Sequence, residues 1–170
     1  MDESGFMLQP IKRRTWAPKG QTPILKCWSN HGKLSIISAI TVSAARRRLG
    51  FYFQIHRKNI SAEEVIEFFK HLHQTLGKNL IVVMDRHRIH RKAAKVLEEK
   101  DWFEPEWFPA YAPELNPVEQ VWNRTKYGEL ANFIPEDLEH LDEEVTTSLE
   151  NKKNNQNLLY SFFKFAKLNL

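Results

Sequence analysis

Two acidic residues of this sequence lie where carboxylates could reach a common ligand. Asp85 directly follows the apolar run Leu80 to Met84, and the reactive groups of an α/β sheet gather at the carboxyl ends of its strands. Glu119 lies in the first turn of a predicted helix, from which its side chain can meet a carboxylate at a neighbouring strand end. The two side chains could therefore converge on one ligand.

Each candidate acid also has a simpler structural explanation. Asp85 could merely cap the helix that follows it. The segment from Asn116 to Glu119 matches a helix start, with Asn at the N-cap, Pro at the first position and Glu at the third. Asp2 stands beside the first methionine, where an acid is usually just exposed. Taken singly, none of the three predicts an active site.

Histidine and tryptophan residues offer two further kinds of site. His87 and His90 lie three residues apart beside an aspartate, which allows a zinc site, but we favour the carboxylate site. Trp16, Trp28 and Trp122 could stack on nucleic-acid bases. Tryptophans beside strands and in amphipathic helices are more often core residues, so we leave them out of the predicted site.

Basic charge is concentrated in the N-terminal third of the chain. The formal net charge is +4, but residues 1–60 hold eleven Lys or Arg against two acids, and residues 135–150 hold seven acids and no Lys or Arg. Basic runs can neutralise phosphates with little regard to base sequence, although each run alone is typical of a solvated turn. The candidate nucleic-acid-binding residues are Lys12, Arg13, Arg14, Lys19, Arg46, Arg47 and Arg48.

Composition restricts the class of protein. The length and a hydrophobic content of 42% predict one domain with a single core. The lone cysteine, Cys27, excludes an internal disulfide and a cysteine-cluster zinc site. The longest apolar runs are too short to span a bilayer, and the N-terminus lacks the layout of a secretory signal. We expect a soluble, intracellular protein.

The first part of the chain predicts strands followed by a helix. Two β-rich runs, 23–29 and 33–43, flank Asn30-His31-Gly32, whose turn chemistry predicts a hairpin. Another strand is predicted at 50–57. Ser61-Ala-Glu-Glu has the form of a capping box, and apolar residues then recur at three- and four-residue steps, which predicts a helix to about Leu76.

Strands and helices alternate in the rest of the chain. Five successive apolar residues at 80–84 predict a central strand covered on both faces. A helix at 90–100, a short strand at 102–108 and a helix from Pro117 to about Leu130 should follow. Two acidic or amphipathic helices complete the chain, with a polar loop at 151–157. This order indicates an α/β fold with a mixed sheet.

Four segments together resemble the DDE transposases of bacterial insertion sequences related to mariner. They are DESGF at 2–6, RTWAPKGQTP at 14–23, VVMDRHRIH at 82–90 and YAPELNPVEQVW at 111–122. The segments follow the family's order over essentially the full chain, and 33 residues separate Asp85 from Glu119, close to the family's characteristic spacing. The LNPVEQVW segment is the most diagnostic.

The resemblance implies a ribonuclease-H-like fold, with a mixed central sheet flanked by helices. In that fold the antiparallel part of the sheet supplies Asp2, a parallel strand supplies Asp85 and a helix supplies Glu119. The three residues would be catalytic and would hold two Mg²⁺ or Mn²⁺ ions about 4 Å apart, with Asp2 bridging them. Water would cleave the DNA strand, and the freed 3′-hydroxyl would attack target DNA. Family members usually keep a histidine at the position of His90, near the active site.

The resemblance also implies partners and domain limits. The DNA partners would be double-stranded transposon ends and target DNA, the protein would act as a homodimer, and its location would be cytoplasmic and DNA-associated. The family normally has more of the first strand, and a helix-turn-helix region, before the first aspartate. We therefore expect residues 1–170 to be a single catalytic domain with a truncated first strand and no helix-turn-helix region.

Two other functions stay open. The first is a truncated, catalytically inactive transposase remnant that at most binds DNA through the basic N-terminal segment. In its favour, Arg86-His87-Arg88 stands where the family tends to have Asn followed by small residues or proline. The second is another ribonuclease-H-like nuclease acting on RNA–DNA hybrids or junctions, which the LNPVEQVW and DESGF segments disfavour.

Overall fold

The computed structural model describes residues 1–26 and 32–168. Within these ranges the strands are β1 (Asp2–Met7), β2 (Lys33–Val42), β3 (Leu49–His56), β4 (Leu80–Met84) and β5 (Phe103–Trp107). The α-helices are α1 (Ala62–Leu76), α2 (Arg88–Leu97), α3 (Pro117–Arg124), α4 (Leu138–Lys153) and α5 (Gln156–Phe165). A 3-10 turn at Pro113–Leu115 precedes α3, and a π-helical turn at Thr125–Glu129 follows it. The predicted α/β class is confirmed.

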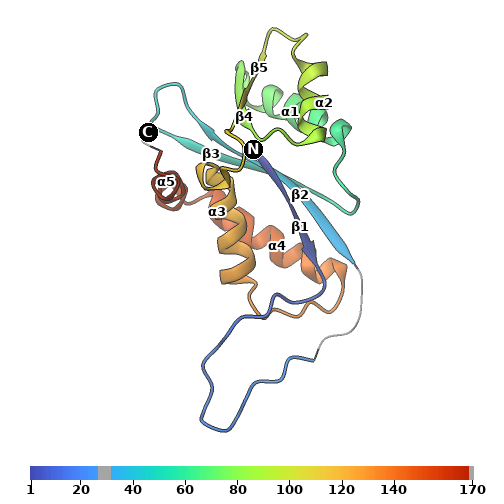
Figure 1. Ribbon diagram of the computed structural model, residues 1–170, viewed down its shortest axis with the longest axis vertical. Helices are drawn as coiled ribbons and strands as arrows, with labels where there is room; N and C mark the ends of the chain where they lie inside the picture. The colour runs from blue at the N-terminus through green and yellow to red at the C-terminus, as the bar shows by residue number, and fades with distance from the viewer. Residues whose placement is uncertain (27–31, 169–170) are drawn as a thin grey trace.

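The strands form an antiparallel sheet, β1-β2-β3, and a parallel pair, β4-β5. Asp2 is the partner of Ser38 on β2, and Ser38 is the partner of Phe53 on β3. The backbone nitrogen of Met1 donates a hydrogen bond to the carbonyl oxygen of Val83, 2.9 Å away, so the start of β1 lies beside β4 (Figure 1). The antiparallel and parallel parts therefore meet where Asp2 begins the first strand.

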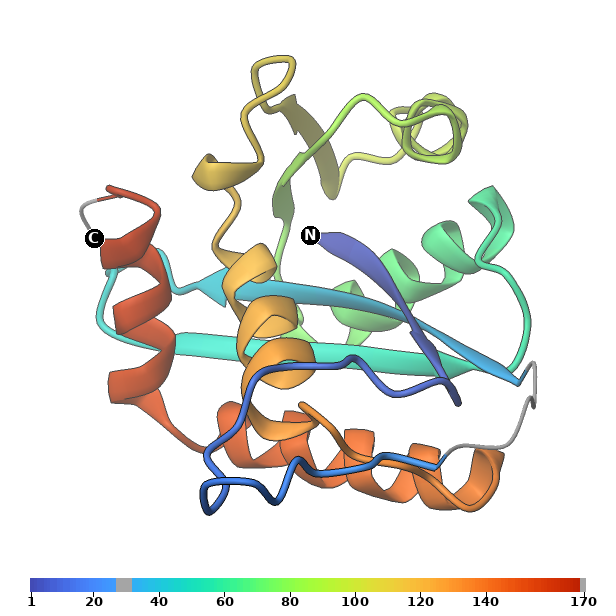
Figure 2. The same ribbon diagram turned by 60° about the horizontal axis from the view of Figure 1, so that its bottom comes forward.

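Helices cover both faces of the antiparallel sheet. One core joins the face bearing Phe6, Ile36 and Phe51 to α3, α4 and α5. A second core joins the opposite face, through Ile37 and Ala39, to α1, α2 and the β4-β5 pair. Figure 2 shows α3 and α5 crossing in front of this sheet while α1 lies behind it. The site at the start of β1 is consequently held by two separate cores.

Three of the helical predictions are confirmed at their ends. Ser61 caps α1 with a complete capping box, and Gly77 ends it in a left-handed conformation with φ 59°. The predicted helix from Pro117 is present as α3 followed by the π-helical turn. Two helices complete the described chain, as predicted. The loop predicted at 151–157 is shorter than expected, because α4 ends at Lys153 and α5 begins at Gln156.

The predicted hairpin at residues 23–43 is wrong for its described part. Residues 23–26 form no strand, whereas 27–31, which include Cys27 and Trp28, lie outside the described residues. β2 instead pairs with β1 over Lys33–Ser38 and with β3 over Ser35–Val42. Both edges of β2 are thus occupied where a hairpin partner would have to bind.

The prediction that β4 is covered on both faces is also wrong. Leu80, Val82 and Met84 are buried in the second core, while Ile81 is 70% and Val83 42% exposed. The strand pairs with β5, and helices pack against one of its faces only. An unbroken apolar run does not distinguish this arrangement from a fully covered strand.

Residues 8–26, between β1 and β2, form a long arm that leaves the body of the molecule (Figure 1). Its base is held by two hydrogen bonds with Asn132, whose nitrogen donates to the carbonyl of Ile11 and whose Oδ1 accepts from the nitrogen of Arg13. Trp16 on the arm is fully exposed, so the expectation that it is a core residue is wrong.

No helix in the part of the chain that the structure describes is long and apolar enough to cross a membrane.

Candidate active site

Asp2 lies on the face of β1 that packs against α3. The indole Nε1 of Trp122 donates a hydrogen bond to Asp2 Oδ2 at 3.1 Å. Trp122 is only 4% exposed and packs edge-on against Phe6, with 6.1 Å between ring centroids. Burial, then the nearby charges of Glu119 and Glu3, raise the pKa of Asp2 to about 7. The carboxyl group is therefore partly buried, and a second negative charge repels it.

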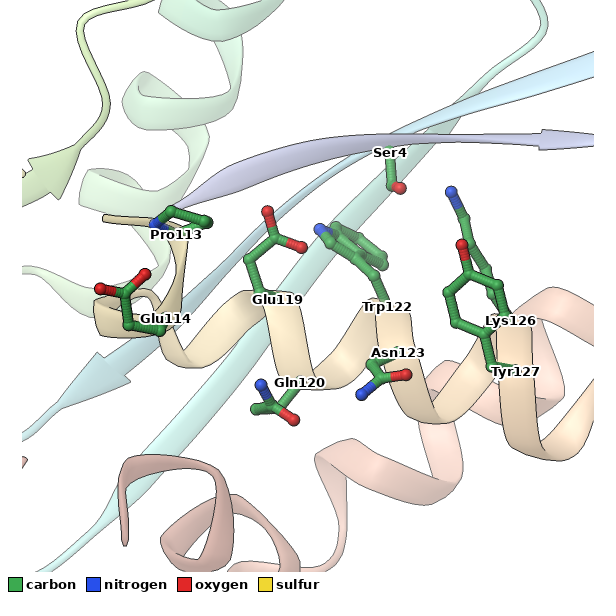
Figure 3. A pocket seen from close by; sticks show the side chains of 9 residues that line it. All are labelled: Ser4, Pro113, Glu114, Glu119, Gln120, Trp122, Asn123, Lys126 and Tyr127. Carbon is green, nitrogen blue, oxygen red and sulfur yellow. The ribbon is translucent and has the colours of Figure 1, made fainter. Parts of the chain in front are cut away.

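The Glu119 side chain is presented from the start of α3. Pro117 occupies the first turn, and the side chain of Asn116 accepts from the nitrogen of Val118 at 3.2 Å. The predicted helix start is confirmed, and Asn116 makes the side-chain cap. Figure 3 shows the Glu119 carboxylate directed toward β1. The first helical turn thus aims this acid at the strand that carries Asp2.

Asp85 lies beyond the end of β4, where its carboxylate contacts α2. Its Oδ1 accepts from the backbone nitrogen of His87 at 2.9 Å and lies 2.5 Å from Nδ1 of His90. The simpler explanation, that Asp85 caps this helix, is wrong, because His87 precedes the first turn of α2 and no side chain in the described part of the chain caps that turn. The Asp85 side chain is 60% exposed, whereas that of His90 is 1% exposed. The expected histidine near the active site is present.

The second ring nitrogen of His90 contacts an acid that sequence reasoning missed. Nε2 lies 2.8 Å from both carboxylate oxygens of Glu3. Burial works against the charged imidazole, but the hydrogen bonds and charges of Glu3 and Asp85 outweigh it and raise the pKa of His90. Both nitrogens are engaged by carboxylates, so His90 has none left for zinc, and His87 lies beside it with 5.8 Å between ring centroids. The zinc alternative is not supported.

The three predicted acids come from β1, the end of β4 and the start of α3, but they do not form one tight cluster. Among residues 1–26 and 32–168, no three His, Cys, Asp or Glu side chains are grouped so that they could hold a metal ion. Asp2 and Glu119 influence each other through their charges, whereas Asp85 turns Oδ1 toward His90. Oδ2, the Asp85 oxygen that does not face His90, is the one left for an ion.

A cation lies beside the Asp2–Glu119 pair. Lys126 projects from the π-helical turn, with its Nζ 5.0 Å from the centroid of the Phe6 ring. Burial lowers the pKa of Lys126, while the charges of Glu119 and Asp2 act in the opposite direction. Turns of this π-helical kind inside helices are frequent at functional sites. The lysine therefore belongs to the same site as the two carboxylates.

A shallow groove runs along the exposed side of α3. One hollow, of about 430 Å³, holds Ser4, Glu119 and Lys126 in its wall (Figure 3). A second, of about 400 Å³, includes Arg13 and Phe165. Both hollows are lined by Gln120, Asn123 and Tyr127. The groove thus leads from the candidate acids to the base of the arm.

The predicted basic residues fall into two separate groups. Lys12, Arg13, Arg14 and Lys19 are exposed on the arm, and Arg13 donates from Nη1 to the carbonyl of Tyr127 at 3.0 Å. Arg46, Arg47 and Arg48 are exposed in the turn between β2 and β3, at the other end of β2. In that turn Ser43 Oγ accepts from the nitrogens of Arg47 and Arg48. The two groups therefore lie on different segments, the arm and the β2–β3 turn.

Three residues of the site were missed from the sequence: Glu3, Trp122 and Lys126. Trp122 is a core residue, as predicted. Its indole nitrogen also donates a hydrogen bond to Asp2, which the sequence did not indicate. Lys126 follows Glu119 by seven residues, two helical turns, a spacing that places both on one face. That spacing could have indicated the lysine. No comparable signal exists for Glu3.

Loss of the Trp122 hydrogen bond should weaken metal binding at Asp2. We expect Trp122→Phe, which retains most of the packing against Phe6, to lower Mn²⁺ affinity about fivefold, the effect of roughly 1 kcal/mol. Titration calorimetry measures the change. Trp102→Phe, in a half-buried tryptophan that stacks on His73, is the matched control. Equal affinities of wild type and Trp122→Phe would contradict a role for the indole nitrogen.

Comparisons with known proteins agree with this fold. A family model described as DDE superfamily endonuclease matches residues 1–142. The Mos1 mariner paired-end complex with Mn aligns with a TM-score of 0.69 and 16% identity, covering 98% of this chain and 51% of that one. The Mos1 paired-end complex with the left transposon end aligns with a TM-score of 0.68 and 16% identity, covering 98% of this chain and 51% of that one. The Mos1 strand transfer complex aligns with a TM-score of 0.66 and 14% identity, covering 97% of this chain and 50% of that one.

The chain spans about half the length of these solved transposases. The structural match confirms the predicted ribonuclease-H-like fold. A search of curated proteins gave no match. The family match confirms the resemblance found in the DESGF and LNPVEQVW segments, because it covers both. This chain belongs to the DDE superfamily endonucleases.

Proposed function

We propose that this chain is the catalytic domain of a transposase, which cleaves DNA strands and transfers them in a metal-dependent reaction. The observation that carries the proposal is the pair formed by Asp2 and Glu119, two acids close enough that the charge of Glu119 helps to raise the pKa of Asp2. Asp85 supplies a third carboxylate from the neighbouring strand end. The proposed catalytic residues and metal ligands are Asp2, Asp85 and Glu119.

The donor set suits Mg²⁺ or Mn²⁺. All three proposed ligands are carboxylates, which hard divalent cations prefer. Burial, and then repulsion by Glu119 and Glu3, raise the pKa of Asp2, and a bound cation would remove the repulsion. Two ions held by these residues would stabilise the attacking and leaving oxygens of phosphoryl transfer.

The residues of the chain have distinct parts in this proposal. Asp2, in its ionised form, would hold the ions from β1, and the Trp122 indole fixes one of its oxygens. Glu119 would hold them from the first turn of α3. Asp85 would contribute the oxygen that does not face His90. Lys126, beside the acids, can contact a DNA phosphate.

Double-stranded DNA, as transposon ends and target, is the proposed partner. The groove along α3 offers Gln120, Asn123 and Tyr127 to a DNA backbone that approaches Glu119. The basic residues of the arm and of the β2–β3 turn would hold more distant phosphates, weakly selective for sequence. We further propose a homodimer and a DNA-associated, cytoplasmic location, as the resemblance to transposases implies.

Metal binding and nicking by the unmodified chain test the proposed function. We expect Mn²⁺ binding by titration calorimetry and nicking of supercoiled duplex DNA that requires Mn²⁺ or Mg²⁺ and stops with a chelator. A folded protein that neither binds the ion nor nicks DNA would instead favour the inactive remnant. Faster cleavage of RNA–DNA hybrids than of duplex DNA would favour the other nuclease class.

Replacing Lys126 with methionine should separate DNA contact from metal binding. We expect nicking at low protein concentration to fall about tenfold, because a charge-assisted phosphate contact of roughly 1.5 kcal/mol is lost. Mn²⁺ affinity should rise slightly, since a like charge near Asp2 and Glu119 is removed. Lys95→Met, on the exposed side of α2, is the control. A drop in Mn²⁺ affinity would contradict this assignment.

A further inference from the structure

The alternation of β1 sends its two neighbouring acids to opposite faces. Asp2 contacts Trp122 of α3, whereas Glu3 contacts His90 of α2. Successive strand residues point to opposite sides, so this division follows from the strand itself. Glu3 therefore follows a proposed metal ligand in the sequence, but its side chain lies on the opposite face of β1 from the Asp2–Glu119 pair.

His90 is a rigid link between Glu3 and Asp85. Its ring is 1% exposed, its Nδ1 lies 2.5 Å from Asp85 Oδ1, and its Nε2 lies 2.8 Å from the two oxygens of Glu3. Rotation of the ring would break both contacts in a buried place, where an unpaired polar group is costly. The ring orientation is thus fixed from the β1 side by Glu3.

This link determines which oxygen of Asp85 is available. Oδ1 is occupied by two groups, the His87 nitrogen and the His90 ring. Among the described residues, no protein donor contacts Oδ2, and the side chain is 60% exposed. Without the histidine, only the His87 nitrogen would hold this exposed carboxylate, which would then lose more freedom on binding an ion.

We propose that Glu3, acting through His90, is a positioning residue that holds Asp85 with Oδ2 presented to a metal ion. The inference rests on the proposed function, because it concerns the same three-carboxylate site. Hydrogen-bonded partners behind a ligand typically change metal affinity 10- to 100-fold when they are removed. The Glu3–His90 pair would act on Asp85 in this way.

Two substitutions of Glu3 separate positioning from charge. Glu3→Ala removes both the charge and the partner of His90, whereas Glu3→Gln removes the same charge but can still pair with Nε2. We expect Glu3→Ala to weaken Mn²⁺ binding about tenfold or more, and Glu3→Gln to stay within about threefold of wild type, by titration calorimetry. Equal losses in both variants would overturn the proposal, because charge alone would then explain them.

Glu99→Ala, an exposed acid after α2, is the control for general loss of negative charge. Thermal unfolding of each variant by circular dichroism establishes that it is folded. Where Glu3→Ala does not fold, Glu3→Gln alone still tests the proposal, because a tenfold loss of Mn²⁺ affinity in this folded variant would overturn it.

A measurement without metal gives an independent answer. The carboxyl ¹³C signal of Asp85 and the ring ¹⁵N signals of His90 report the contact between them. In Glu3→Ala we expect both sets to shift toward those of free side chains, and in Glu3→Gln to stay near wild type. Unchanged signals in folded Glu3→Ala would overturn the positioning role. Failure of the wild type to bind Mn²⁺ would contradict the proposed function, and the carboxyl signal would still decide whether Glu3 positions Asp85.

Discussion

Replacing Asp85 with alanine is expected to abolish Mn²⁺ binding and metal-dependent nicking of duplex DNA together. The change removes one of three proposed ligands. Metal stabilisation of a transferring phosphoryl group is worth several kcal/mol, so nicking should fall on the order of 1000-fold. Titration calorimetry and a nicking assay on the same samples measure both effects.

The Asp85→Ala protein should remain folded. The side chain is 60% exposed, and it contributes hydrogen bonds to His87 and His90 rather than core packing. Asp101→Ala, an exposed aspartate before β5, is the matched control and should bind and nick like wild type. An Asp85→Ala protein that still nicked at the wild-type rate would show that Asp85 is not a ligand in the reaction and only bonds to His87 and His90.

Local patterns predicted the elements that position Asp85 and Glu119. The helix at 62–76 has an intact capping box, and the helix start at Asn116 and Pro117 follows the expected sequence. Such signals are contained within a few residues, where backbone hydrogen bonds and side-chain caps are decided. The fold class and two of the three proposed ligands could therefore be placed from the sequence.

Pairing between distant strands was not predictable in the same way. The sequence favoured a hairpin at 23–43 because Asn30-His31-Gly32 is turn chemistry, but β2 pairs with β1, which lies beyond the whole arm. The residues DESGFM of β1 carry little strand signal by themselves. The register that places Asp2 opposite Ser38 is fixed by packing of both faces rather than by any local turn.

The same limit explains the residues that sequence reasoning missed. Trp122 and Asp2 are 120 positions apart, and Glu3 and His90 are 87 apart. A contact of that kind depends on how β1 is placed between α3 and α2, and no spacing rule expresses it. Lys126 differs, because its distance from Glu119 along one helix face could have been used.

Replacing Asp2 with asparagine is expected to stabilise the metal-free protein at pH 8. The pKa of Asp2 is about 7 in the folded protein and 3.8 in its ordinary state. Since the folded value is raised, the stability that this group contributes is present below pH 3.8 and is lost as the pH rises through 7. The difference between the two pKa values sets an upper limit of about 4 kcal/mol on the gain in free energy of unfolding. Partial exposure and relaxation reduce the expected gain to about 1 to 2 kcal/mol.

The pH dependence of the stability difference between Asp2→Asn and wild type tests whether ionised Asp2 destabilises the fold. Asparagine retains an acceptor for the Trp122 indole but carries no charge to be repelled by Glu119 or Glu3, or attracted by the Met1 ammonium and Lys126. The melting temperature of Asp2→Asn should exceed that of wild type by roughly 3 to 6 °C at pH 8, and the gap should close toward pH 4. A constant difference between pH 4 and 8 would mean that the ionisation of Asp2 is not its cause.

With excess Mn²⁺ at pH 8, wild type should become more stable than Asp2→Asn. A bound ion stabilises the folded state by an amount that grows with its concentration over the dissociation constant, about 2.7 kcal/mol at a 100-fold excess. Wild type gains this stability because the ion neutralises the repulsion between Asp2 and Glu119, whereas Asp2→Asn lacks a ligand. A metal ligand is expected to behave in this way: ionised Asp2 destabilises the metal-free protein, and the bound ion restores the stability. A buried acid with a purely structural role would give no such reversal.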